Sequence, residues 1–84
     1  MELNLQDMNY ISEVFLVGNK CVLIANRELS TEELDDTYGE FWDQGVSEDV
    51  VITVISSSKK SSIANNPELR LIVNEGLRVY SVAS

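Results

Sequence analysis

The sequence has no histidine, which removes the most versatile catalytic side chain. Histidine is the commonest general base and metal ligand, and it activates the nucleophile in Ser–His and Cys–His enzymes. The single cysteine, Cys21, can form neither an internal disulfide nor a zinc or iron–sulfur site. Glycine-rich phosphate-binding motifs are also missing. We therefore expect a protein that is not an enzyme and that uses no cofactor and no metal ion.

Long apolar runs are missing too, since none approaches the roughly 20 residues that span a bilayer. No secretory or transit signature opens the chain, and a lone cysteine in an apolar stretch is typical of a reducing compartment. We expect a cytoplasmic protein that does not bind a membrane. Its 84 residues suit one domain, 1–84, with one modest core.

Basic residues are scarce: six Lys and Arg face 14 Asp and Glu, and the net charge is −8. Most of the acids lie between Glu28 and Asp49, a stretch that contains no Lys or Arg. This charge argues against direct binding to nucleic acid or to an anionic membrane. It favours a basic protein partner, and it also serves solubility.

The clearest helix signal covers 30–45, STEELDDTYGEFWDQG. Ser30 and Glu33 predict a capping box at its start, and Gly45 is a natural left-handed stop. Apolar residues at helical spacing predict the side that packs on a sheet. These residues are Leu34, Tyr38, Phe41 and Trp42. We expect Tyr38 and Trp42 to be core residues, with an exposed interface aromatic as the alternative.

Two apolar stretches around Gly18-Asn19 predict a β-hairpin of strands 13–17 and 20–25. A two-residue loop sets the register, which would pair Leu16 with Cys21, Val14 with Leu23, and Phe15 with Val22. Both faces of this hairpin are apolar, so we expect both to be covered, in part by a partner or by the N-terminal residues. Residues 1–9 form either a flexible arm or an extra edge strand.

The C-terminal half predicts a βαβ unit. Its strands are 50–55 and 77–82, parallel to each other with a right-handed crossover. Between them lie a polar loop, 56–62, and a helix from Asn66-Pro67 to Gly76, which we expect to end in a Schellman cap. The predicted fold is α+β, in the order β-β-α-β-α-β, with a mixed sheet of about four strands and two helices on one face.

The loop 56–62, SSSKKSS, is the one place where hydroxyl groups and positive charge gather. It follows a strand and precedes a helix, a position where α/β folds often bind ligands. However, it lacks the glycines that let a backbone close around a phosphate. We keep two alternatives, a solvated loop and an anion site, and the anion site would use Ser58, Lys59, Lys60 and Ser61.

The acidic side of helix 30–45 is either a solvated face or a partner-binding surface. Carboxylates at fixed spacing on a rigid helix can imitate nucleic-acid phosphates and can pair with Arg and Lys. We predict a DNA-mimic inhibitor or antagonist, of the phage anti-defence or toxin-immunity type, that docks on a nuclease or other nucleic-acid-binding protein. The predicted contacts are Glu32, Glu33, Asp36, Glu40 and Asp43, extended by Glu48 and Asp49. The alternative is an assembly subunit or adaptor that docks through the hairpin or a sheet edge, in a complex or as a homodimer.

Tyr38-Gly39-Glu40 and Trp42-Asp43, followed by a strand, a helix and a closing strand, resemble the barstar family of acidic ribonuclease inhibitors. The resemblance covers about half of the chain. The two motifs lie closer together here and the N-terminal hairpin differs, so we assign no membership. The resemblance implies only that a compact acidic α/β domain can work by plugging a basic active site.

Overall fold

The β-hairpin forms the centre of the sheet, as strands β1 (Ile11–Val17) and β2 (Lys20–Ala25). The computed structural model describes residues 2–82. Gly18, with φ of 57°, reverses the chain between the two strands. The predicted register is confirmed, with Val14 opposite Leu23, Phe15 opposite Val22, and Leu16 opposite Cys21. Successive side chains alternate between the faces of the sheet, so both faces have an apolar centre.

Two further strands flank the hairpin in the order β3-β2-β1-β4. β3 (Val51–Ser56) runs parallel to β2, and β4 (Leu77–Ser81) runs antiparallel to β1. The two outer strands therefore run in the same direction, as predicted, but they lie at opposite edges of the sheet. The unit whose parallel strands are neighbours is β2-α1-β3, in which α1 (Thr31–Asp43) makes the connection.

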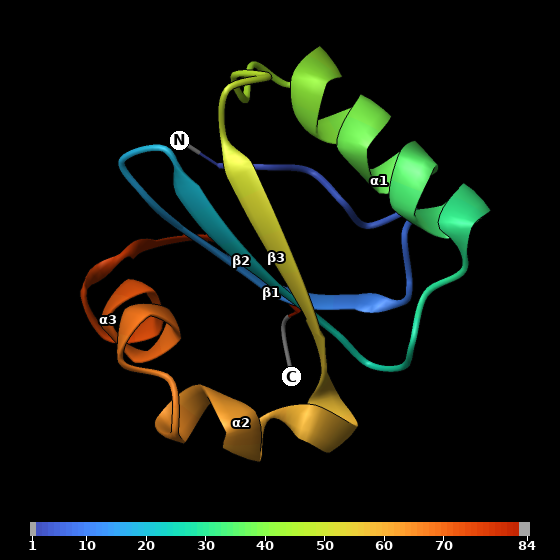
Figure 1. Ribbon diagram of the computed structural model, residues 1–84. Coiled ribbons are helices and arrows are strands. Elements are labelled where there is room, and N and C mark those ends of the chain that lie inside the picture. The colour runs from blue at the N-terminus through green and yellow to red at the C-terminus, as the bar shows by residue number, and fades with distance from the viewer. Residues whose placement is uncertain (1, 83–84) are drawn as a thin grey trace.

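Helices cover both faces of this sheet (Figure 1). α1 packs on one face, and α2 (Ser61–Ala64) and α3 (Pro67–Glu75) pack on the other. The α+β class and the mixed four-stranded sheet are confirmed, but the expectation of two helices on one face is wrong. A single helical layer would leave one apolar face of the hairpin in water, and burial of that face stabilises the second layer.

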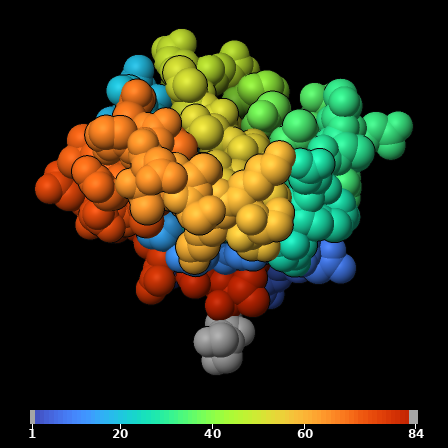
Figure 2. Space-filling model, turned by 60° about the horizontal axis from the view of Figure 1, so that its bottom comes forward, coloured from blue at the N-terminus to red at the C-terminus, as the bar shows by residue number. Residues whose placement is uncertain are grey.

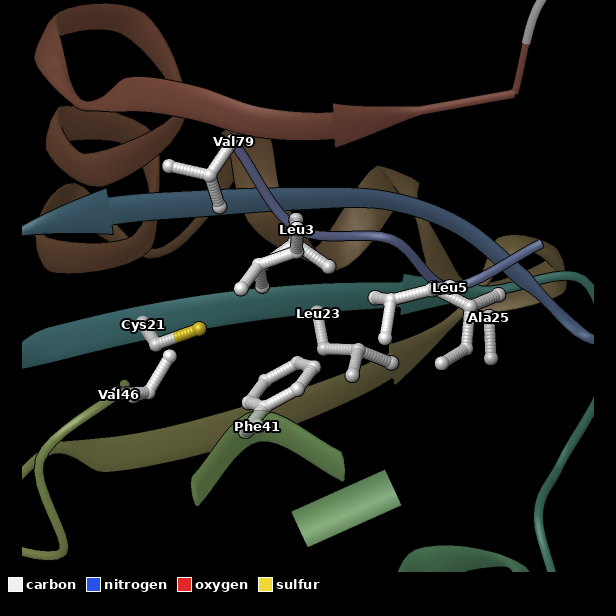
Figure 3. Packing of buried hydrophobic residues seen from close by; sticks show 10 residues of the cluster. Leu3, Leu5, Cys21, Leu23, Ala25, Phe41, Val46 and Val79 are labelled. Atoms are coloured by element: carbon white, nitrogen blue, oxygen red, sulfur yellow. The ribbon is translucent and has the colours of Figure 1, made fainter. Parts of the chain in front are cut away.

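The apolar core is divided into two clusters by the sheet. Under α1, Phe41 and Leu23 are fully buried and pack with Leu3 and Leu5 of the N-terminal segment (Figure 3). The buried residues under α2 and α3 are Phe15, Val22, Ile24, Ile55, Ile63 and Ile72. The hairpin is thus covered on both faces from within the chain.

The N-terminal segment 2–10 forms no strand, but it is attached to the rest of the fold. Leu3 and Leu5 are buried, and the Leu3 amide donates a hydrogen bond of 2.9 Å to the Val79 carbonyl of β4. The segment meets the outer edge of β4 at this hydrogen bond and then passes under α1, where Leu5 packs with Leu23 and Phe41. We call this segment the arm.

The prediction that residues 56–62 form a polar loop is wrong, because this stretch contains helical turns. A short 3-10 helix, η1 (Ser57–Lys59), leads into α2, and Ile63 of α2 is buried in the second cluster. Burial of this one apolar side chain explains the difference, since the polar residues around it stay exposed.

The predicted start of α3 is confirmed, because the Asn66 side chain accepts hydrogen bonds from the amides of Glu68 and Leu69. The predicted Schellman cap at its end is wrong. Gly76 has φ of −71° and ψ of 160°, an extended conformation that leads directly into β4.

None of the helices within residues 2–82 combines the length and the apolar character needed to cross a membrane.

Candidate protein-binding surface on the acidic helix

Both ends of α1 are held by local hydrogen bonds. The predicted capping box is present: the Glu33 amide donates to Ser30 Oγ at 3.2 Å, and the Ser30 amide donates to Glu33 Oε1 at 3.0 Å. At the other end, Gly45 has φ of 98° and the Val46 amide donates to the Phe41 carbonyl at 2.9 Å, as in a Schellman motif. The first and last turns of α1 are therefore fixed, and so are the positions of the side chains along the helix.

The inner side of α1 is narrower than the predicted stripe. Phe41 and Thr37 are completely buried, while Trp42 keeps 47% of its surface exposed. Thr37 was not predicted as a core residue. Its hydroxyl donates to the Glu33 carbonyl at 2.8 Å, and this hydrogen bond satisfies the hydroxyl group without water. The prediction that Trp42 is a core residue is therefore wrong, and its ring lies at the surface.

The outer side of α1 carries carboxylates that have no basic neighbour. Four of them are exposed and form no ion pair within residues 2–82: Glu32, Asp35, Asp36 and Asp43. Three belong to the predicted contact set, and Asp35 is an addition. Like charges three or four residues apart on a helix each cost about 0.2–0.5 kcal/mol. This surface therefore lowers the stability of the helix that bears it.

Glu33 is the predicted contact that is already engaged within the chain. Arg27 Nη1 donates to Glu33 Oε1 at 2.8 Å, and Nη2 bonds to Oε2. These hydrogen bonds from the guanidinium, with the amide of Ser30, lower the pKa of Glu33 to about 2. Arg27 lies just before the stretch that lacks basic residues, so the sequence offered no direct sign of this pair. Glu33 mainly fixes the start of α1.

Glu40 is also tied to a neighbour, and it lies on the arm side of the helix. Its Oε1 accepts a hydrogen bond of 2.8 Å from Gln44 Nε2. The same Nε2 donates to the Asn4 carbonyl at 2.7 Å, and the Asn4 amide donates back to Gln44 Oε1. Glu40 is half-buried and helps to hold the arm against α1.

Glu48 and Asp49 lie in the exposed turn that follows α1. Glu48 lines a groove together with Tyr38 and Trp42, on the side of α1 that faces β3. Helical spacing places Glu40 and Asp36 on the other side of Trp42. The predicted belt is thus split in two, with an acidic arc on α1 and a smaller acidic group beside β3.

The basic residues of the proposed anion site are paired within the chain. Lys59 Nζ lies 3.0 Å from Glu28 Oε1, where η1 meets the segment that leads into α1 (Figure 2). Lys60 Nζ lies 3.6 Å from Glu13 Oε1, and Ser58 Oγ lies 3.0 Å from Ser56 Oγ. Ser61 is exposed at the start of α2. An incoming anion would have to compete with Glu28 and Glu13 for both lysines.

Other chemical groups offer little beyond structure. In the described part of the chain, no three or more Asp, Glu or Cys side chains gather in a way that could hold a metal ion. Cys21 is buried, and desolvation raises the pKa of its thiol to about 12. It is therefore a core residue with little thiolate character.

Comparisons of this chain with protein-family models, with curated proteins and with solved structures gave no match.

Proposed function

We propose that this protein is a non-enzymatic inhibitor or antagonist, which docks α1 on the basic cleft of a nuclease or another nucleic-acid-binding protein. The observation that carries the proposal is the group of exposed carboxylates on α1 that lack a basic neighbour. Glu32, Asp36 and Asp43 are the leading contacts among the predicted residues, and Asp35 joins them. Glu33 and Glu40 support these contacts by holding the helix in place.

The spacing of these carboxylates suits several separate cationic side chains. With a rise of about 1.5 Å per residue, Glu32 and Asp36 lie about 6 Å apart along the helix axis, and Asp43 lies about 10 Å further on. Each carboxylate can then accept its own Arg or Lys side chain, in place of successive phosphates of a nucleic acid. Such a surface speeds association through long-range attraction, which salt weakens.

The energetic cost of this surface also favours a functional role. Asp36 faces Glu32 and Glu40 at spacings of four residues, so repulsion acts on it from both sides. Asp43 lies in the last turn of α1, where a negative charge opposes the helix dipole. Solubility alone is satisfied by a surface of mixed signs, without these penalties.

The test is a double charge reversal, Asp36→Lys with Asp43→Lys. Because both substitutions relieve repulsion, the variant should stay folded and gain stability, which thermal unfolding would show. The immobilised wild type should capture nucleic-acid-binding proteins from a lysate, and duplex DNA or rising salt should release them. The reversed variant should bind the captured protein at least tenfold more weakly, since coupling energies of close charge pairs exceed about 1.4 kcal/mol.

A matched control is Asp7→Lys with Glu75→Lys. These two exposed acids lie outside α1, and their reversal changes the net charge by the same amount. The control should bind like the wild type. Equal binding by the α1 variant and the control would contradict the proposal. If both bind more weakly, net charge alone explains the attraction, and if both bind like the wild type, the α1 carboxylates make no contact. The proposal also places the protein in the cytoplasm, where Cys21 stays reduced.

The alternative function, an assembly subunit, had two candidate docking surfaces, the hairpin and a sheet edge, and the hairpin is no longer a candidate. Both faces of the hairpin are covered within the chain, as the complete burial of Val14, Val22 and Leu23 shows. A sheet edge is the remaining route to such a role. Sedimentation at low and high salt separates the two functions, because an apolar assembly would change little with salt and the acidic contact would weaken.

A further inference from the structure

The two edges of the sheet are protected to very different degrees. The outer edge of β4 is met by the arm, whose Leu3 amide bonds to Val79, and β4 itself carries Arg78. The edge strand β3 has the sequence VITVIS, which contains no charge and no proline. Natural proteins usually block an edge with such residues, because an open apolar edge accepts another strand. β3 is visible at the surface between α1 and α2 (Figure 2).

The open edge presents unpaired backbone groups. The Val51 amide donates inward to the Asn19 carbonyl at 2.8 Å, at the start of the ladder with β2. Backbone groups of alternate residues in a strand point to opposite sides, so the N–H and C=O groups of Ile52 and Val54 point outward. Within residues 2–82 these outward groups have no hydrogen-bond partner. They form the template for one further strand.

Apolar side chains are also exposed next to the β3 edge, on both faces of the sheet. On the α1 face, Tyr38, Trp42, Val50 and Ile52 line a groove of about 220 Å³, with Glu48 at its end. On the other face, Val51 keeps 63% of its surface exposed. A strand that adds to β3 alternates its side chains between these two faces. One set would lie against Trp42, and the other set would cover Val51.

The charges around β3 indicate what kind of strand fits. Glu48 lines the groove and Asp49 follows it in the chain; both are exposed and form no ion pair among the described residues. An Arg side chain in the groove would stack on the exposed Trp42 ring and reach the Glu48 carboxylate. A second copy of the chain fits poorly, because each copy carries a net charge of −8 and Lys59, near the far end of β3, is already paired with Glu28.

We propose that β3 is a strand-addition site for an extended, basic segment of another protein. The segment adds an outer strand to the sheet, directs Arg or Lys side chains toward Trp42 and Glu48, and directs apolar side chains toward Val51. Main-chain hydrogen bonds to Ile52 and Val54 supply affinity, and the two side-chain sets supply specificity. This site does not use Asp36 or Asp43, the two α1 carboxylates that the charge-reversal variant removes, so it does not depend on the function proposed above.

The test uses the synthetic peptide Ac-Arg-Val-Arg-Val-Thr-Val-NH2 and the wild-type protein. Trp42 is the only tryptophan, so its emission reports binding in the groove. Amide hydrogen exchange measured by NMR reports the edge itself. We expect the Trp42 emission to shift, and exchange at Ile52 and Val54 to slow at least tenfold with saturating peptide. The same peptide with Glu in place of Arg should produce neither change.

Two variants separate the edge from general charge attraction. Val51→Lys blocks the edge in the way natural edge strands are blocked, and Leu71→Lys places the same charge at an exposed apolar position on α3. Val51→Lys should weaken the peptide at least tenfold, and Leu71→Lys should leave it unchanged. The Asp36→Lys and Asp43→Lys variant should keep the protection at β3, so failure of the first proposal would be seen separately.

Three results would overturn the proposal. One is unchanged exchange at Ile52 and Val54 with the Arg peptide at millimolar concentration. Another is equal protection by the Arg and Glu peptides, which would remove the charge argument. The third is a dimer of the free protein with these amides already protected, which would assign the edge to a second copy.

Discussion

Arg27 holds Glu33 through both of its terminal nitrogens, with Nη1 2.8 Å from Oε1. The same carboxylate accepts the amide of Ser30 and closes the capping box of α1. One side chain therefore links the end of the β2–α1 connection to the first turn of the helix. This link fixes where the acidic surface begins.

The lowered pKa of Glu33 predicts how the stability of the fold changes in acid. Its pKa is about 2 in the folded chain, against an ordinary value of 4.5. The folded state thus favours the ionised form, so this contribution is complete above pH 4.5 and is lost as the pH falls toward 2. Glu33→Gln should lower stability at pH 7, and the difference from the wild type should shrink between pH 4.5 and 2. Urea unfolding at several pH values measures it.

The Gln side chain can still accept the Ser30 amide, so this substitution isolates the charge. Glu32→Gln is a suitable control, because Glu32 is exposed and unpaired in the described chain. It should show no comparable loss at pH 7. A difference between Glu33→Gln and the wild type that stays constant from pH 7 to 2 would contradict the role of the Arg27 pair.

Gly39 predicts a gain in stability. It lies in the middle of α1, and a Cβ atom built there meets no atom within 4 Å. Gly39→Ala should raise the free energy of unfolding by about 0.5–1 kcal/mol, because alanine restricts the unfolded chain and favours the helix. Chemical denaturation measures the change. An unchanged or lower value would contradict the open space at Gly39 and the expected gain in helix propensity.

Gly76 predicts the opposite result for the same substitution. Its Cβ would lie 2.3 Å from the Ile72 carbonyl oxygen and 3.2 Å from the Leu16 carbonyl oxygen, both backbone atoms. Neither can move away without disturbing α3 or β1. Gly76→Ala should therefore cost about 1–3 kcal/mol of stability. A cost below 0.5 kcal/mol would mean that the junction between α3 and β4 adjusts freely.

Alanine substitutions at the neighbouring residues Phe41 and Trp42 of α1 should differ in their cost in stability. Phe41 is completely buried against the sheet, so Phe41→Ala should cost about 3–5 kcal/mol. Trp42 keeps 47% of its surface in water, so Trp42→Ala should cost about 1 kcal/mol. Thermal or urea unfolding of both variants measures the difference. Similar costs would contradict the assignment of Trp42 to the surface.

Much of the local structure follows from residues close together in the chain. The hairpin register depends on a two-residue turn at Gly18, and the start of α1 depends on Ser30 and Glu33. The left-handed stop at Gly45 depends on its lack of a side chain. These interactions span a few residues, and the amino-acid types at each position are enough to predict them.

Longer-range packing accounts for what the sequence argument missed. The apolar faces of the hairpin required two helical layers, and this requirement put α1 on one side and α2 and α3 on the other. It also turned Trp42 toward the open edge of β3 and brought Lys59 to Glu28, which lies 31 residues away in the chain. Such contacts depend on how whole elements exclude water from both faces of one sheet, and no local pattern specifies them.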